Sequence, residues 1–136
     1  MTDCVFCKII NGKIPCTKIY ENDKVLAFLD VSPISKGHTL VIPKKHFESL
    51  KDIPEDILCD LTKTAKKLAP LIIKAVNAHA FNLGLNNGKE AGQLVMHVHF
   101  HIIPRFENDG HKHWSEKSYK ESEMQKVAGK IQKEIK

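Results

Sequence analysis

The chain has 136 residues, 42% of them hydrophobic and 27% charged, which fits one domain over residues 1–136 with a substantial core. The net charge is +5, but the lysines lie among acids without interleaved aromatic residues, which argues against a nucleic-acid partner. No apolar run approaches the ~20 residues of a membrane span, and the start, MTDCVFCKII, does not resemble a signal peptide. We therefore expect a cytoplasmic protein that does not bind membranes.

The first third of the chain predicts one short helix and three strands. Residues 5–11 are predicted to form a helix that ends at Gly12. Residues 18–21 and 25–29 have the composition and spacing of a β-hairpin. Residues 38–42 form another β-rich run, HTLVI.

A long amphipathic helix is predicted next. Asp52, followed by Pro54 and Glu55, has the pattern of a capping box at a helix start. Apolar residues then recur at helical spacing as far as Val76. Pro70 lies inside this helix and should kink or split it, because proline removes a backbone donor and crowds the preceding turn.

The remaining segments complete an α+β pattern. Residues 81–85 are predicted to form a strand, residues 86–92 a glycine-bearing loop, residues 97–103 a strand and residues 121–135 a second, basic helix. Because the strands have hairpin spacing, we expect a mostly antiparallel sheet of about five strands, with one long helix and one or two shorter ones.

The segment HVHFHII, residues 97–103, sets three histidines at alternate positions. In a strand, His97, His99 and His101 would share one face. The opposite, apolar face would consist of Met96, Val98, Phe100 and Ile102. The Cα atoms of the outer two histidines would lie about 13 Å apart, too far for all three imidazoles to converge easily on one ion. We therefore expect the three histidines to have at least two different roles.

A single histidine on such a strand would most simply be structural. Three of them indicate a functional site, because half-buried imidazoles cost desolvation energy unless partners or ligands use them. The alternative is that the H-x-H spacing belongs to a metal site.

The amino-terminal pair Cys4 and Cys7 has C-x2-C spacing. This spacing suits two thiolates on one tetrahedral zinc ion, which then needs two more ligands. A thioredoxin-like redox role is the usual alternative, but the βαβ context expected for it is missing.

Taken together, the motifs resemble the histidine triad (HIT) family of nucleotide hydrolases and transferases, in particular its Hint-like branch. The resemblance is carried by HVHFHII and by the segments CVFCKIINGKIP, IYENDKVLAFLDVSPISKGHTLVIPKKH and NNGKEAGQLVMHVHFHIIPR. It implies a HIT fold, a symmetric homodimer and a purine nucleotide substrate. In the carboxy-terminal region, which holds His111, His113 and Trp114, the family lets one subunit approach the active site of its partner.

The resemblance also implies roles for the catalytic residues. His99 matches the histidine that attacks the α-phosphorus and forms a covalent nucleotidyl intermediate. His101 matches the histidine that hydrogen-bonds the phosphoryl oxygens, and His38 matches a supporting histidine on a neighbouring strand.

Other residues match the substrate pocket. Asp30 matches the acid that holds the ribose hydroxyls, and Asn86 and Gln93 match polar residues near the phosphate, although both also suit an ordinary loop. The walls of the base pocket correspond to Phe6, Ile9, Phe28 and Val31. Leu94 departs from the branch, which usually has Ser or Thr directly after this glutamine, so the leaving-group preference is open.

For zinc, the resemblance implies a structural site made of Cys4, Cys7, His46 and His97, and no catalytic metal. The sequence therefore predicts an adenosine 5'-phosphoramidase that works through a nucleotidyl-His99 intermediate. The alternatives are a dinucleoside polyphosphate hydrolase and a zinc-stabilised nucleotide-binding or scaffold protein with little turnover.

Overall fold

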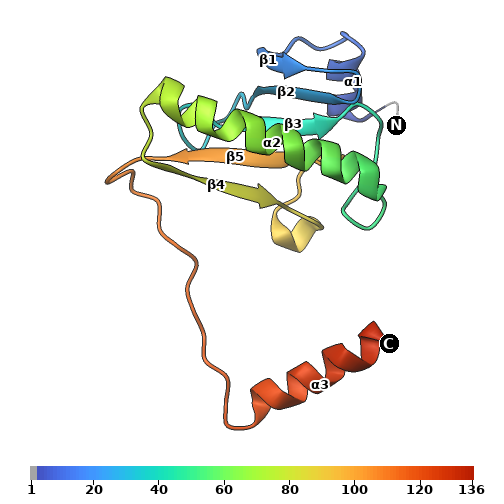
Figure 1. Cartoon of the computed structure of the whole chain (residues 1–136), viewed down its shortest axis with the longest axis vertical. Coiled ribbons are helices and arrows are strands. Elements are labelled where there is room, and N and C mark those ends of the chain that lie inside the picture. The colour runs from blue at the N-terminus through green and yellow to red at the C-terminus, as the bar shows by residue number, and fades with distance from the viewer. Residues whose placement is uncertain (1–2) are drawn as a thin grey trace.

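The computed structural model describes residues 3–136 and is built on one five-stranded sheet (Figure 1). The strands are β1 (Lys18–Glu21), β2 (Val25–Leu29), β3 (Thr39–Pro43), β4 (Ala80–Leu85) and β5 (Phe100–Arg105). They lie in the order β1-β2-β3-β5-β4, and each pair of neighbours is antiparallel. The α+β class and the five-stranded antiparallel sheet are confirmed.

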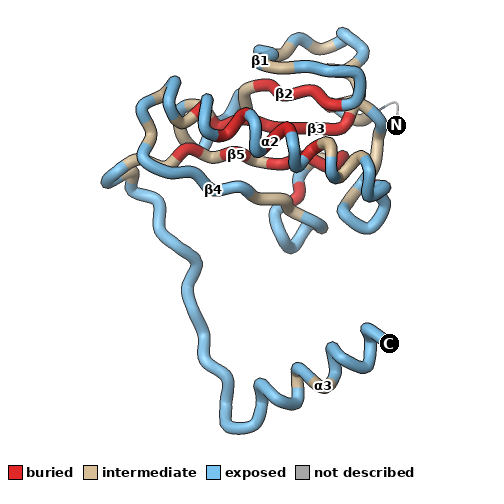
Figure 2. The backbone as a smooth tube through the Cα atoms, in the orientation of Figure 1, coloured by how far each residue is buried: buried red, intermediate tan, exposed pale blue. Residues whose placement is uncertain are grey.

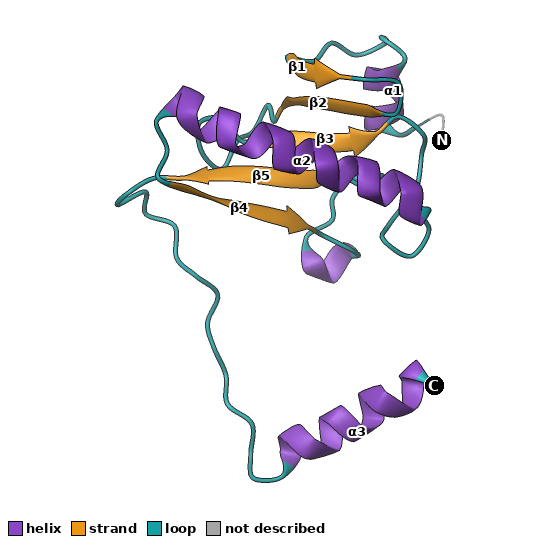
Figure 3. Ribbon diagram, in the orientation of Figure 1, coloured by secondary structure: helices purple, strands orange, loops and turns teal. Residues whose placement is uncertain are grey.

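Helices of very different lengths accompany the sheet (Figure 3). They are α1 (Val5–Ile10), α2 (Glu55–Val76), α3 (Glu123–Ile135) and the short 3-10 helix η1 (Lys89–Ala91). The long α2 crosses one face of the sheet. The short α1 packs through Phe6 against the opposite face of β2 and β3.

The central strands are buried on both faces (Figure 2). Successive side chains of a strand point to opposite faces, so β2 and β3 each contribute to two clusters. One cluster joins the sheet to α2 and includes Val25, Ala27, Val41, Leu61, Ala65, Leu68, Phe100 and Ile102. The other joins the sheet to α1 and consists of Phe6, Leu26, Phe28, Leu40 and Ile42.

The pairing of β3 with β5 places the last triad histidine. His101 lies opposite Leu40, so it is beside the residues that begin β3. Its neighbours Phe100 and Ile102 point into the cluster under α2. His101 therefore faces the α1 side of the sheet, where a site can form between α1 and the strands.

Two details of the long helix differ from the sequence prediction. The N-cap residue is Pro54, and no side chain among residues 3–136 caps it; Asp52 instead accepts a hydrogen bond from Ser49 Oγ at 3.2 Å, so the capping box is wrong. The predicted split at Pro70 is also wrong, because α2 is continuous. Pro70 lies on the exposed side of the helix, while residues on its other side are anchored in the core.

The histidine strand is shorter than predicted. Strand β5 begins at Phe100, and His97 lies in a bend before it. Val98 is buried as expected, but Met96 is 45% exposed, so its placement on the apolar core face is wrong. The bend removes the strict alternation on which that expectation depended.

The carboxy-terminal part of the chain leaves the sheet as an exposed arm. After β5 an extended segment runs away from the sheet and leads to α3, which contains no buried residue (Figures 1 and 2). Among residues 3–136, no helix is both long and apolar enough to cross a membrane.

Candidate functional site

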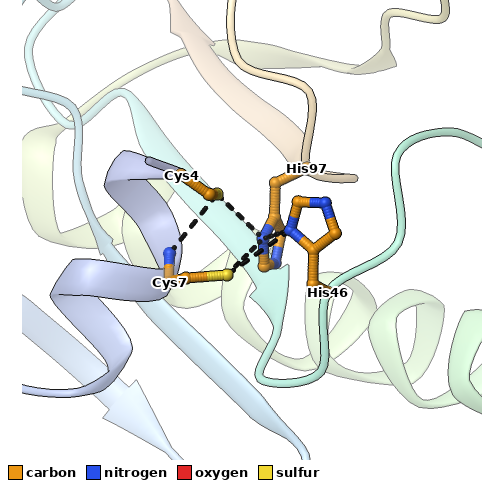
Figure 4. Close-up of side chains that lie close together, drawn as sticks. All are labelled: Cys4, Cys7, His46 and His97. Carbon is orange, nitrogen blue, oxygen red and sulfur yellow. Dashed lines mark hydrogen bonds between the residues drawn. The ribbon is translucent and has the colours of Figure 1, made fainter. Parts of the chain in front are cut away.

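Two cysteines and two histidines from distant parts of the chain meet beside α1 (Figure 4). Cys4 is the N-cap of α1, and its Sγ accepts a hydrogen bond from the N–H of Cys7 at 3.4 Å. His46 follows β3, and His97 comes from the bend before β5. The four ligand atoms, two Sγ and two Nδ1, all lie within 4.8 Å of one another.

The geometry of this Cys-His cluster fits a tetrahedral zinc ion. His97 Nδ1 lies 3.5 Å from Cys4 Sγ and 3.1 Å from His46 Nδ1, and Cys7 Sγ lies 3.4 Å from His46 Nδ1. A tetrahedron with zinc–sulfur and zinc–nitrogen bonds of ordinary length has edges of roughly 3.3 to 3.8 Å. Four donors at these separations, two of them sulfur, favour zinc over a redox pair.

The protonation of His97 agrees with this role. Its Nε2 donates to the carbonyl oxygen of Pro43 at 2.8 Å, so the lone pair lies on Nδ1, which faces the sulfur atoms. The side chain is fully buried, and burial lowers the pKa of His97 to about 4. Burial also raises the pKa of the Cys7 thiol, a cost that a bound cation offsets by stabilising the thiolate.

The second triad histidine is fixed by the backbone of the first. His99 Nδ1 lies 2.6 Å from the carbonyl oxygen of His97. A carbonyl oxygen only accepts, so Nδ1 carries the proton and Nε2 carries the lone pair. The side chain is only 6% exposed, and its Nε2 makes no hydrogen bond to any part of the chain that the structure describes.

His38 and His101 form a directional pair. The backbone N–H of Ile34 donates to His38 Nδ1 at 3.1 Å, so the neutral ring carries its proton on Nε2. His38 Nε2 then donates to His101 Nδ1 at 2.9 Å. His101 must carry its own proton on Nε2, an atom that is buried and has no hydrogen-bond partner within residues 3–136.

All three of these imidazoles are neutral near pH 7. Burial lowers the pKa of His99 and of His38, and it lowers the pKa of His101 to about 4. Asp30 opposes this effect at His38, since one of its carboxylate oxygens lies 3.7 Å from His38 Nε2. A neutral imidazole with a free lone pair is a competent nucleophile.

His99 and His101 open into a cavity of about 410 Å³ between α1 and the sheet. This volume is in the range of small-molecule sites. The walls are mostly apolar, and the Phe6 ring meets the His99 ring edge to face, with centroids 5.0 Å apart. The predicted pocket residues that line it are Phe6, Ile9, Phe28, Asp30 and Val31, the last being 93% exposed at the rim.

The two predicted phosphate-side residues differ in position. Gln93 is buried and does not line the cavity: its Oε1 accepts from Gly88 N–H at 2.8 Å and its Nε2 donates to Glu48 O at 2.6 Å. Asn86 lies close to the rim, since its Nδ2 is 3.7 Å from where a Cβ on Gly92 would be. Gln93 therefore stabilises the loop that carries this rim.

Several residues of the cavity wall were not identified from the sequence. They are Val5, Ile14, Pro15, Cys16, Leu29, Ser32, Leu40, Gly92 and Val95. The segment that follows α1 carries three of them, at residues 14–16, for which the sequence predicted no role in the pocket. Leu94, the departure noted above, is 90% exposed at the same cavity.

Comparison with known proteins places these clusters in context. The HIT domain family matches residues 11–108. An uncharacterized HIT-like protein of Methanocaldococcus jannaschii is 54% identical over 107 residues, covering 79% of this chain and 82% of that protein. The adenosine 5'-monophosphoramidase of Schizosaccharomyces pombe is 46% identical over 102 residues, covering 75% and 74%. The Arabidopsis thaliana adenylylsulfatase is 47% identical over 107 residues, covering 79% of this chain but 54% of that protein.

Solved structures show the same fold. The SMU.412c protein of Streptococcus mutans superposes with a TM-score of 0.93 at 41% identity, covering 100% of this chain and 87% of that one. A zinc-bound histidine triad family protein from Mycobacterium smegmatis gives a TM-score of 0.78 at 33% identity, covering 98% and 97%. With these matches, and with His99 and His101 of the H-x-H-x-H segment lining the cavity, the chain belongs to the HIT family.

Proposed function

We propose that the protein hydrolyses adenosine 5'-phosphoramidates through a covalent nucleotidyl intermediate on His99. The observation that carries the proposal is the hydrogen bond from His99 Nδ1 to the carbonyl of His97, because it leaves a lone pair on Nε2 in a cavity of nucleotide size. The relative named as an adenosine 5'-monophosphoramidase supports the substrate class.

The chemistry follows from the proton positions. His99 Nε2 attacks the α-phosphorus, and the phosphorus–nitrogen bond of the substrate breaks. Nδ1 keeps its proton, so the intermediate is a cationic phosphoimidazole. The leaving amine takes its proton from solvent, since a neutral imidazole does not give up its N–H, and His101 keeps its proton on Nε2. Water then attacks the phosphorus, the phosphorus–nitrogen bond to His99 breaks, and AMP leaves while the proton of the water passes to solvent.

His101 also stabilises charge at the phosphoryl group. Its Nε2–H is a buried donor without a partner among the described residues, and such a donor costs free energy unless a ligand accepts from it. A phosphoryl oxygen would be that acceptor. His38 keeps the donor in place by donating to the other nitrogen of the same ring.

The remaining pocket residues hold the nucleoside. We assign Asp30 to the ribose hydroxyls and the apolar walls to the purine base, with Asn86 near the phosphate. Gln93 supports the phosphate side by holding the rim loop. Asp30 already accepts from the N–H of Ser32 at 2.9 Å, which orients its carboxylate.

The Cys-His cluster is assigned to structural zinc, and no reaction step uses it. When bound, the ion would cross-link the start of α1 to the bend that carries the His97 carbonyl. The chain's own contribution is the buried, neutral His97, whose position determines the acceptor for His99.

We also propose a cytoplasmic homodimer. Strand β4 is at an edge of the sheet and exposes Phe81 and Leu83 by 42% and 49%. An exposed apolar edge strand is prone to pair with another chain, and Trp114 on the arm, which is 93% exposed, would add to such an interface. Light scattering after size exclusion would show twice the mass of 15.4 kDa if this is correct.

The test of function is hydrolysis of a fluorogenic adenosine phosphoramidate by the wild type and by His99→Ala. We expect turnover in the first and a loss of several orders of magnitude in the second. Adenylyl sulfate is a second candidate substrate, favoured by the adenylylsulfatase relative. Diadenosine polyphosphates should be measured beside both, and AMP binding without turnover of any of them would favour the scaffold alternative.

A further inference from the structure

The chain that follows β5 forms a tight loop around one carboxylate. Arg105 donates to Asp109 through Nε at 2.8 Å and through Nη2 at 3.1 Å. The backbone N–H groups of Phe106 and His111 donate to the same carboxylate at 3.1 Å and 3.0 Å. These bonds, led by those from Arg105, hold the pKa of Asp109 well below its usual range, so this clamp is charged at neutral pH.

The hydrogen bonds around Asp109 place His111 beside the loop that joins β2 to β3. His111 Nε2 lies 3.1 Å from the carbonyl oxygen of Ile34, and since a carbonyl only accepts, the imidazole donates. The neighbouring Ser35 donates through Oγ to the carbonyl oxygen of Pro104 at 2.6 Å. Two side-chain bonds therefore tie this loop to the end of β5 and the segment after it.

Ile34 connects the clamp to the catalytic histidines. Its carbonyl accepts from His111, and its own N–H donates to His38 Nδ1. That N–H is the group that puts the His38 proton on Nε2, and His38 Nε2 in turn donates to His101. A path of hydrogen bonds thus runs from the arm to His101, a residue that lines the cavity and whose Nε2 is buried.

We propose that His111 is a positioning residue for the reaction, acting through Ile34 on the tautomers of His38 and His101; this inference rests on the proposed function. Without the bond from His111, Ile34 is held only through its neighbours in the chain, among them Ser35 with its bond to Pro104, and the Ile34 N–H selects the His38 tautomer less firmly. His38 then presents Nε2 without a proton part of the time, and His101 loses the partner that keeps its own proton on Nε2. The apolar base pocket is made of other residues and is unaffected.

The chain provides a matched control two positions away. His113 is also exposed and lies on the same arm, but it makes no hydrogen bond to residues 3–136. We expect His111→Ala to lower kcat about 3- to 10-fold with KM within about twofold, as for the loss of one hydrogen bond. His113→Ala should match the wild type, and His111→Gln, which restores an N–H donor of similar reach, should recover most of the kcat.

A second measurement reports the tautomer without turnover. Imidazole ¹⁵N chemical shifts distinguish a protonated from an unprotonated ring nitrogen, and His38 should have its proton on Nε2 in the wild type and in His113→Ala. In His111→Ala the His38 shifts should move toward a mixture of the two tautomers. If the wild type hydrolyses none of the candidate substrates, the proposed function fails, yet these shifts still decide the role of His111.

Two results would overturn the proposal. One is a His111→Ala protein with the kcat and the His38 shifts of His113→Ala. The other is a kcat that falls equally in His111→Ala and His111→Gln, together with a lower melting temperature, because that would make His111 a support of the fold and nothing more.

Discussion

The Cys-His cluster and the catalytic histidines use the same side chain in opposite orientations. His97 donates through Nε2 to the carbonyl of Pro43 and turns Nδ1 toward two sulfur atoms. His99 donates through Nδ1 to the carbonyl of His97 and leaves Nε2 free in the cavity. In each case one backbone carbonyl selects the tautomer. This selection leaves the lone pair of one imidazole directed at the Cys-His cluster and that of the other at the cavity, which suits the proposed roles of metal ligand and nucleophile.

The two clusters are also joined. The side chain of His97 belongs to the Cys-His cluster, while its carbonyl oxygen is the acceptor for His99. Loss of the metal should therefore displace His97, and with it the carbonyl oxygen that orients His99. Removal of His99 should leave the Cys-His cluster intact. The predictions below test this asymmetry.

The largest effect is expected from His99→Ala. Turnover should fall by at least about 10³-fold, because no other group offers a lone pair at the phosphorus. The zinc content of the purified variant should equal that of the wild type, since His99 is not a member of the Cys-His cluster. Kinetics and metal analysis on one preparation check both statements, and zinc loss in this variant would contradict the separation of roles.

Next in size is Cys7→Ser, which removes one sulfur ligand from the cluster. We expect zinc loss and a fall in unfolding free energy of about 3 kcal/mol or more, because metal binding free energy is folding free energy at such a site. Turnover should fall as well, because the His97 carbonyl that orients His99 is then held less firmly. Cys59→Ser is the control, as Cys59 is exposed on α2 and outside the cluster. An unchanged melting temperature in Cys7→Ser would show that the cluster carries no structural metal.

A smaller effect is expected from acid. Burial holds the pKa of His101 near 4, below its ordinary value of 6.5. A depressed pKa contributes stability that is fully present above the unfolded value and is lost as the pH falls through the folded value. Between pH 7 and pH 5 the wild type should lose roughly 2 kcal/mol more unfolding free energy than His101→Gln. Denaturant titrations at the two pH values measure this difference, and equal losses would show that His101 is not held neutral.

An effect of similar size is expected at Gly37, which precedes His38 in the loop beside the catalytic histidines. Gly37, next to His38, has φ +90, and a Cβ there would lie 3.0 Å from Val76 Cγ1 and 3.3 Å from Pro104 Cγ. Gly37→Ala should destabilise the protein by about 1–3 kcal/mol. Gly12 has φ +75 with nothing within 4 Å of a Cβ, so Gly12→Ala isolates the backbone strain. Equal melting temperatures for the two variants would mean that the close approach contributes nothing.

The sequence predicted the structure correctly where a residue pattern is compatible with only one local conformation or one kind of site. Strands β1 to β3 follow from short β-rich or apolar runs bounded by turn residues, and the pairing of the two thiols follows from C-x2-C spacing. The failures arise where tertiary contacts override a local rule. Met96 is exposed because the chain bends at His97, and Pro70 does not split α2 because the helix is anchored by packing on its other side.

The catalytic details lay beyond sequence reasoning for another reason. Tautomers depend on which backbone group meets each ring nitrogen, and the N–H of Ile34 and the carbonyl of His97 have no signature in the residue types. Gln93 shows the converse: its residue type suits a phosphate contact, but its amide is used by Gly88 and Glu48. Cys16 lines the cavity only because the chain after α1 folds over it.

The central claim is that the lone pair on His99 Nε2 makes a covalent bond to the nucleotide. The most direct measurement is intact-protein mass spectrometry during turnover of a slowly hydrolysed adenosine phosphoramidate. The reaction is quenched with denaturant and kept out of acid, because acid hydrolyses the phosphorus–nitrogen bond of the adduct, and peptide mapping follows. We predict an adenylyl adduct on His99 that is present in the wild type and absent from His99→Ala. Turnover with no adduct at any time, or an adduct on another residue, would contradict it.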